Sequence, residues 1–135
     1  MKILIDTNVV IDNLARRDEH AESLKILHLC ELGNLEGVVT TVTIMDVMYI
    51  LRKHIDFAEV CDAVQILMQI VDVVPILQKD IMEAFSGGFH DFEDAVQAAC
   101  AARIEADHII TLNIKDFKNS AVSAILPCDF LEVLC

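Results

Sequence analysis

Residues 1–12 read MKILIDTNVVID, and they introduce a pattern that much of the chain repeats. Ile3, Leu4 and Ile5 form a short apolar run, which we expect to be a buried strand. Asp6 follows at once, and a helical pattern runs over residues 9–16. A buried strand that ends in a polar turn and passes directly into a helix is typical of α/β folds with a parallel sheet.

The same alternation continues along the chain. Helical spacing covers residues 22–32, 43–53, 58–70, 80–85 and 91–106. Strand-like runs cover 37–41, 71–76 and 108–112, with a turn or short helix at 115–117 and a last strand expected at 128–134. The order predicts one domain, 1–135, with a mostly parallel central sheet of four to five strands between two layers of helices.

Composition and charge limit the possible functions. The chain is 55% hydrophobic, yet no apolar run reaches the roughly 18 residues that a membrane span needs. Asp6 comes too early for the apolar core of a signal peptide. We therefore expect a cytoplasmic protein without a membrane partner. Its cysteines are scattered without a CxxC motif, which favours free thiols: Cys30, Cys61, Cys100, Cys128 and Cys135.

The chain has 22 acidic and 10 basic residues, for a net charge of −12. This charge argues against a protein that binds nucleic acid mainly through bulk positive charge. An enzyme whose acids cluster around a divalent metal remains compatible with this charge.

Acidic residues stand near the exits of the predicted strands. In parallel sheets, ligands bind outside the carboxyl ends of the strands, so these positions matter. Three of the places share one pattern, a capping residue and then an aspartate three residues later. The acids are Asp6, and Asp46, Asp94 and Asp116 after the caps Thr43, Asp91 and Asn113. Taken one at a time, each pattern is explained by helix capping, because a carboxylate in the first turn also complements the helix dipole.

Together the four acids point to a metal site. A doubly wound fold brings them to one sheet edge, and two carboxylates ~5 Å apart repel by about 3 kcal/mol at an effective dielectric near 20. A divalent cation relieves this repulsion, and oxygen ligands suit Mg²⁺ or Mn²⁺. Such a site can activate a water and neutralise charge on a scissile phosphate.

Four stretches resemble the PIN-domain ribonucleases, a family in which many bacterial members are toxins of toxin–antitoxin pairs. They are MKILIDTNVVID, TVTIMDVMYIL, DFEDAVQAACA and DHIITLNIKDF, and together they span nearly the whole chain. The resemblance implies a PIN-like fold and a Mg²⁺- or Mn²⁺-dependent endoribonuclease that hydrolyses single-stranded RNA.

The resemblance also implies residue roles. Asp6, Asp46, Asp94 and Asp116 would be the catalytic acids, with Asp6, Asp94 and Asp116 as the metal ligands. Thr7, Asn8, Asp91, Thr111 and Asn113 would support them. Asp46 stands where the family usually has glutamate, and Asn113 stands where many members have aspartate. Both departures weaken the expected metal site, unless Asp116 substitutes for the missing acid.

Neighbouring residues receive roles from their positions. Lys115 and Lys118 flank Asp116 and are candidates for contacts with RNA phosphates. Asp91 is expected to cap its helix, Glu93 to face solvent and Asp12 to lie on the surface.

Two helices carry apolar faces. In 91–106 the core stripe is expected at Phe92, Ala95, Val96, Ala99 and Cys100, and in 43–53 at Ile44, Val47, Met48 and Leu51. Met45, Tyr49 and Ile50 remain as surplus apolar positions, which indicate an interface. The resemblance implies a homodimer and an antitoxin protein as partners.

Two other readings stay open. The chain could be a catalytically weakened PIN-like module that binds protein or RNA, which the departures at Asp46 and Asn113 favour. A receiver-like phosphoacceptor would need paired acids after the first strand, and only Asp6 stands there, so this reading ranks lower.

Overall fold

The computed structural model describes residues 1–17 and 20–134. Its centre is one sheet of five strands that are all parallel, in the order β3-β2-β1-β4-β5. The strands are β1 (Lys2–Ile5), β2 (Glu36–Thr40), β3 (Asp72–Val74), β4 (His108–Ile110) and β5 (Ser123–Ile125). The expected α/β fold with a parallel sheet is confirmed, and the strand of the opening stretch lies in the middle of it.

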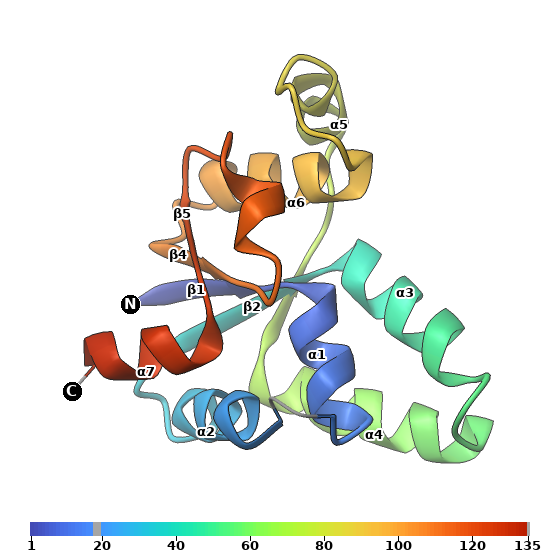
Figure 1. The fold of residues 1–135 in the computed structure, drawn as a ribbon. Coiled ribbons are helices and arrows are strands. Elements are labelled where there is room, and N and C mark those ends of the chain that lie inside the picture. Colours follow the sequence, from blue (N-terminus) through green and yellow to red (C-terminus); the bar gives the residue numbers. More distant parts are fainter. Residues whose placement is uncertain (18–19, 135) are drawn as a thin grey trace.

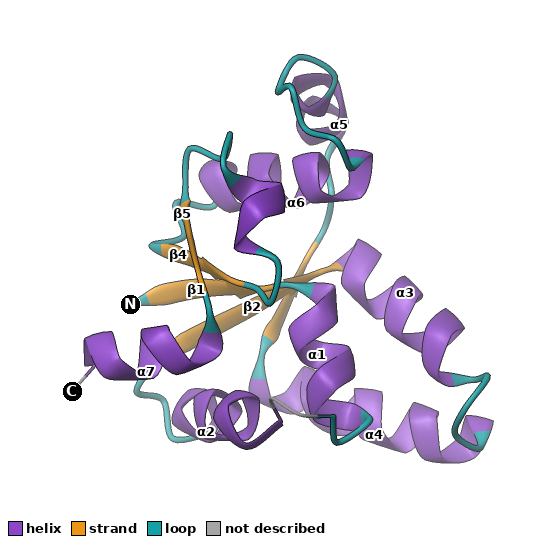
Figure 2. Cartoon of the chain, viewed as in Figure 1, coloured by secondary structure: helices purple, strands orange, loops and turns teal. Residues whose placement is uncertain are grey.

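Helices cover both faces of the sheet (Figures 1 and 2). They are α1 (Thr7–Leu14), α2 (His20–Glu31), α3 (Thr41–Leu51), α4 (Phe57–Ile70), α5 (Gln78–Ala84), α6 (Phe92–Arg103) and α7 (Pro127–Leu134), with a 3-10 turn η1 (Ile114–Phe117). In Figure 1, α5 and α6 lie above the sheet, and α1, α2, α4 and α7 lie below it. Across the described part of the chain, no helix has the length and apolar character needed to cross a membrane.

Strand β1 joins the two halves of the core. Ile3 and Ile5 pack into the cluster formed with α1, α2, α3, α4 and α7, whereas Leu4 packs into the cluster beneath α6. Successive side chains of a strand point to opposite faces, so a continuous apolar run is what a strand buried on both faces requires. All three residues are at most 1% exposed.

The predicted last strand at 128–134 is wrong, because this segment is helix α7. Pro127 occupies the first helical position, where its fixed φ suits a helix and its missing N–H costs nothing. Phe130 is fully buried and packs edge-on against His108, with ring centroids 5.8 Å apart. The fifth strand is instead β5, three residues long, and its length gives too few positions for a periodic signal.

The expected core stripe of the helix after residue 91 needs correction at its start. Ala95, Val96 and Cys100 are buried, but Phe92 is 46% exposed. The first turn of α6 carries Phe92 toward α5, where its ring lies 4.9 Å from that of Phe85. Helical periodicity predicts which face of the helix is apolar, but it does not predict which turns of that face the sheet covers.

Asp12 was expected on the surface, and that expectation is wrong. Asp12 is 4% exposed on α1. Helices α2 and α3 both pack against α1, so a short helix that looks half-polar in sequence is covered on several sides.

An ion pair joins α5 to α6 on the upper layer. The Arg103 Nε–H lies 3.0 and 3.1 Å from the two carboxylate oxygens of Asp80, which is 2% exposed. Arg103 also donates from Nη2 to the carbonyl of Pro75 at 2.7 Å. Charges this deeply buried need a partner, and this pair fixes the two helices in register.

Three of the described cysteines, Cys30, Cys61 and Cys100, are free thiols. Cys30 and Cys100 are buried, Cys61 is half-buried and Cys128 is exposed. Cys135 lies outside the described residues. The sequence-based expectation of free thiols therefore holds for Cys30, Cys61 and Cys100.

Candidate active site

Asp6 lies at the carboxyl end of the central strand and is the N-cap of α1. It is 4% exposed. Its Oδ1 accepts a hydrogen bond from the Thr7 backbone N–H at 2.9 Å, and its Oδ2 accepts one from the Thr111 hydroxyl at 2.9 Å. Burial raises the pKa of Asp6, and hydrogen bonds from Thr111, Gln97 and Thr7 offset part of the rise. Asp6 is therefore a buried acid that three separate segments hold in place.

Thr7, Asn8 and Thr111 connect the ends of neighbouring strands around this acid. The hydroxyls of Thr7 and Thr43 lie 2.8 Å apart, which links α1 to α3. Asn8 donates from Nδ2 to the Thr111 hydroxyl at 3.3 Å. These contacts bring the exits of β1, β2 and β4 into one polar network.

Asp94 lies in the first turn of α6, close to the same edge. Asp91 is the N-cap, and its Oδ1 accepts a hydrogen bond from the Asp94 N–H at 2.9 Å. The Asp94 carboxyl is half-buried, and its pKa is raised to about 7 by burial and then by the charges of Asp6, Asp91 and Asp116. The fold thus brings three other aspartates, from three separate segments, within electrostatic reach of Asp94.

Asp116 comes from η1, next to the exit of β4. Asn113 precedes this turn, but its side chain makes no capping hydrogen bond, and its backbone N–H donates to Thr111 Oγ1 at 3.1 Å. Lys115 and Lys118 are exposed on either side of Asp116. The two lysines take part in no ion pair among the residues that the structure describes.

Asp46 does not stand where the capping pattern implied. Helix α3 begins at Thr41, and its N-cap is Thr40, whose hydroxyl accepts a hydrogen bond from the Thr43 N–H at 3.2 Å. Thr43 is therefore inside the helix, and Asp46 lies in the second turn. The predicted cap at Thr43 is wrong because Thr40, Thr41 and Thr43 are all acceptable caps, and the chain passes from β2 into α3 already at Thr41.

Glu93 is the acid that sequence reasoning dismissed. The residue is exposed, as expected, but its carboxyl meets that of Asp46 across the gap between α6 and α3. Burial, a hydrogen bond with Asp46 and the charges of Asp46, Asp91 and Asp6 raise the pKa of Glu93 to about 8. The sequence feature that could have identified Glu93 as a site residue is its position inside DFED, between Asp91 and Asp94.

Gln97 is the second residue that sequence reasoning missed. It is fully buried on α6, and its amide Nε2 donates to Asp6 Oδ1 at 3.3 Å and to Thr43 Oγ1 at 3.0 Å. A glutamine three residues after Asp94, inside an otherwise apolar run, shares the helix face of that acid. This spacing was visible in the sequence, although nothing in it named the partners.

The donor set fits a divalent cation. In the described ranges, 1–17 and 20–134, no three carboxylate, imidazole or thiol groups already stand in an arrangement that could hold a metal. The acids at this edge have no ion-pair partner among the described side chains, and burial, followed by the neighbouring acids, raises the pKa of Asp94 and of Glu93. Mg²⁺ and Mn²⁺ are bound by carboxylate oxygens, and a bound divalent cation would offset the repulsion between these acids.

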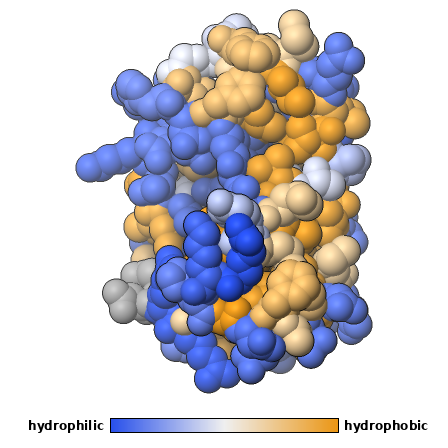
Figure 3. Space-filling model, turned by 90° about the vertical axis from the view of Figure 1, so that its right-hand side faces the viewer, coloured by the Kyte–Doolittle hydropathy of each residue, from blue (hydrophilic) through white to orange (hydrophobic). Residues whose placement is uncertain are grey.

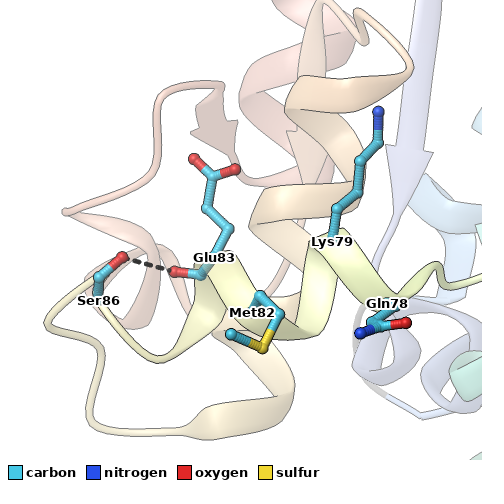
Figure 4. Close-up of a pocket in the computed structure, with 5 residues that line it drawn as sticks. All are labelled: Gln78, Lys79, Met82, Glu83 and Ser86. Atoms are coloured by element: carbon cyan, nitrogen blue, oxygen red, sulfur yellow. Dashed lines mark hydrogen bonds between the residues drawn. The ribbon is translucent and has the colours of Figure 1, made fainter.

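A separate cavity of about 640 Å³ lies on α5, lined by Gln78, Lys79, Met82, Glu83 and Ser86 (Figure 4). Figure 4 shows the hydroxyl of Ser86 bonded to the backbone carbonyl of Glu83, which closes the end of the helix. The cavity contains none of the candidate catalytic residues. Its side chains come from one short helix, so we do not assign the chemistry to it.

Comparison with known proteins identifies the fold. A family model described as PIN domain matches residues 2–115. No curated protein matches the chain. Among solved structures, a toxin–antitoxin complex from Klebsiella pneumoniae is 22% identical, with a TM-score of 0.70, over 93% of this chain and 97% of that chain.

Two further structures are similar. The DNA-bound VapBC of Salmonella typhimurium is 15% identical, with a TM-score of 0.75, over 95% of this chain and 99% of that chain. VapC20 of Mycobacterium tuberculosis, described as a sarcin-ricin loop cleaving toxin, is 14% identical, with a TM-score of 0.66, over 88% and 93%. At these identities the likeness establishes a shared fold.

The raised pKa of Asp94 makes the stability of the metal-free protein depend on pH. An unfolded aspartate titrates near pH 4, whereas folded Asp94 titrates near 7, so between these values the folded state binds more protons. The contribution of the protonated Asp94 carboxyl to the stability of the folded state is fully present below about pH 4 and is lost as the pH rises through about 7. The measurement is the melting temperature of Asp94→Asn minus that of wild type, both in chelator. We expect this difference to be a few degrees larger at pH 8 than at pH 4.5, because only wild type then carries the unfavourable charge.

The exposed Asp72, at the opposite end of the sheet, supplies the control. Asp72→Asn removes one negative charge from β3 and should follow wild type at both pH values. If the melting-temperature difference between Asp94→Asn and wild type is the same at both pH values, the pKa of Asp94 is not raised.

Proposed function

The chain belongs to the PIN domain family, and from this membership we propose that it is a metal-dependent endoribonuclease that hydrolyses phosphodiester bonds of single-stranded RNA, as the toxin of a toxin–antitoxin pair. One observation carries the proposal: Asp6, Asp94 and Asp116, from three separate segments, interact at one sheet edge where no cation compensates them within the described structure. A purely structural role does not explain why a fold would retain this repulsion.

Each acid has a defined part in the proposed reaction. Asp6, Asp94 and Asp116 would hold Mg²⁺ or Mn²⁺, with Asp6 as the buried and most constrained ligand. The bound ion would lower the pKa of a water and neutralise charge on the scissile phosphate. Thr7, Asn8 and Thr111 keep the Asp6 carboxylate in a fixed orientation through direct or shared hydrogen bonds.

Asp46 and Glu93 would form the outer side of the site. Asp46 is one methylene shorter than the glutamate usual in the family, and Glu93 brings a second carboxyl to the same place from α6. Lys115 and Lys118 are exposed beside Asp116, where their ammonium groups can reach RNA phosphates. Asn113, at the exit of β4, would contribute an amide oxygen rather than a charge.

The alternative is a weakened PIN-like module that binds protein or RNA without cutting. Asp46 and Asn113 favour it, and so does the absence of a preformed cluster of three ligands in the described residues. It differs from the nuclease in one physical property. A metal that binds only the native state must raise the melting temperature, and the weakened module predicts little such rise.

RNA cleavage tests the main proposal. We expect the purified chain to cut single-stranded RNA with Mn²⁺ and to lose this activity in chelator. Asp6→Asn or Asp94→Asn should lower the rate by at least about 100-fold, because even groups that only support a metal ligand contribute about 10- to 100-fold. Asp72→Asn should keep wild-type activity. Equal cleavage in chelator, or full activity of the protein with both Asp6→Asn and Asp94→Asn, would refute the proposal of a metal-dependent nuclease at this site.

An antitoxin requires a docking surface, and an apolar groove between α1, α2 and α4 offers one. Its volume is about 390 Å³, and its lining includes Leu14, Leu24, Leu27, Ile66 and Ile70. Glu31 also lines the groove, and Glu59 and Asp62 are exposed on α4. We infer that the occupant is an amphipathic helix with a basic face, supplied by an antitoxin such as the one in the Klebsiella complex.

A matched pair of substitutions on α4 tests the groove. Ile66 is 58% exposed and lines it, whereas Met68 is 49% exposed and does not. When the chain is co-expressed with a candidate antitoxin, Ile66→Glu should weaken the complex at least about tenfold, because a carboxylate would be buried against leucines. Met68→Glu should leave binding unchanged. Equal effects of the two substitutions would place the partner elsewhere.

The expected homodimer has candidate contact residues among the exposed apolar side chains on α3, on and just after α5, and at the start of α6: Met45, Tyr49, Ile81, Met82, Phe85 and Phe92. We propose that they form one dimer patch, and Figure 3 shows hydrophobic surface on the face that it draws. Met45 and Tyr49 are exposed as predicted, whereas Ile50 is half-buried against the core. Arg52 and Lys53 lie over the Tyr49 ring, at 4.4 and 4.7 Å from its centroid. With Asp46 on the same helix, the patch carries both charge signs, so it can face its own two-fold copy.

Sedimentation of the chain alone tests the dimer. Met82 and Phe85 are 61% and 71% exposed, so replacing both with Asp should yield a monomer without unfolding. Val133→Asp, on α7 and 58% exposed, is the control and should remain dimeric. A monomeric wild type would exclude this use of the patch.

A further inference from the structure

We propose that Gln97 is a positioning residue for the reaction: its amide fixes the Asp6 carboxylate so that Oδ2 is the oxygen presented to the metal. The inference rests on the proposed nuclease function. It concerns a residue with no acidic character, which lies inside the stretch DFEDAVQAACA but receives no role from the resemblance.

The contacts of Gln97 come from both ends of its amide. Nε2 donates to Asp6 Oδ1 at 3.3 Å and to Thr43 Oγ1 at 3.0 Å, and Oε1 accepts from the Thr40 hydroxyl at 2.6 Å. The side chain is 0% exposed, so no water competes for these bonds. One glutamine thereby joins α6 to the exits of β1 and β2.

The orientation of this amide is set by chemistry. The Thr40 oxygen already accepts from the Thr43 backbone N–H at 3.2 Å, which leaves its proton free to donate to Gln97 Oε1. The nitrogen end of the amide must then face Asp6, whose ionised carboxylate can only accept hydrogen bonds. A flipped amide would place oxygen against the Asp6 carboxylate, and it would leave Thr40 facing two donors.

Counting acceptors on Asp6 identifies the free oxygen. An ionised carboxylate has about four lone-pair positions, two on each oxygen. Within the described residues, Oδ1 accepts from Thr7 and Gln97, and Oδ2 accepts from Thr111. Without Gln97, both oxygens would have one position open. With it, Oδ2 alone retains a position, so the bond from Gln97 selects the metal-facing oxygen.

Gln97 also fixes the distance between two acids. It lies three residues after Asp94 on α6, on the same helix face. Its bond to Asp6 spans 91 positions of sequence and joins the helix of Asp94 directly to the residue after β1. The relative placement of Asp6 and Asp94 therefore depends on this contact as well as on general packing.

Metal binding by the purified, full-length chain is the test, with Mn²⁺ alone as the probe and calorimetry as the readout. Gln97→Met keeps an unbranched side chain but removes every amide hydrogen bond. Gln97→Glu keeps the shape and the oxygen for Thr40, but it puts an acceptor against Asp6. Both should weaken Mn²⁺ binding by about 10- to 100-fold, the range for groups that orient a metal ligand.

Val96→Ala is the control for a merely structural role. Val96 is buried on the same helix, where it packs with Ala84 and Ala95, so its truncation lowers stability without removing a hydrogen bond to the Asp6 carboxylate. The Mn²⁺ affinity of this variant, and the rise in its melting temperature on adding Mn²⁺, should match wild type. If Val96→Ala weakens Mn²⁺ binding as much as Gln97→Met does, Gln97 acts only through stability.

A second pair of variants keeps the inference testable if replacement of Gln97 prevents folding. Thr40→Val removes the hydroxyl that orients the amide, and Thr40→Ser restores it. Thr40→Val should weaken Mn²⁺ binding and Thr40→Ser should recover most of the affinity. Wild-type Mn²⁺ affinity in both Gln97→Met and Thr40→Val would overturn the inference while leaving the nuclease intact, whereas a wild type without Mn²⁺ binding or cleavage would overturn the nuclease itself.

Discussion

A buried carboxylate at the end of the central strand constrains the rest of the site. Asp6 follows three fully apolar residues of β1 and is itself almost inaccessible to water. A buried ionised group must receive hydrogen bonds from the protein, because burial otherwise favours its neutral form. Thr7, Thr111 and Gln97 supply these bonds from three segments, so the packing of α1, α6 and β4 and the chemistry of the site cannot be separated.

The carboxylates around Asp6 repel one another in the folded protein. A chain with a net charge of −12 gathers Asp91, Asp94 and Asp116 near a further buried acid. Burial, and then the repulsion from these neighbouring charges, raises the pKa of Asp94. The Asp80–Arg103 pair shows how the same chain treats a structural acid, with a guanidinium against both oxygens. The contrast supports a site that a cation from solution completes, since the chain supplies a counter-ion where stability alone requires one.

The exposed apolar surfaces follow from the small size of the domain. The parallel sheet uses both of its faces for the core, so α2, α3, α4 and α5 expose the apolar residues that remain. The groove is lined by α1, α2 and α4, and the patch residues come from α3, α5 and α6, so the proposed antitoxin and second copy would contact different helices. Exposed apolar surface of this kind is costly in water unless a partner covers it.

The sequence by itself determined the layer architecture, because the apolar run Ile3–Ile5 and the helical spacings depend only on neighbours along the chain. It also indicated the acids, and the capping role of Asp91, since a cap acts within one turn. Only the tertiary structure decided where helix α3 starts, that residues 127–134 are helical, that Glu93 meets Asp46, and that Gln97 holds Asp6. These features depend on which residues of two distant segments face each other, and periodicity along one segment contains no information about the partner it will meet.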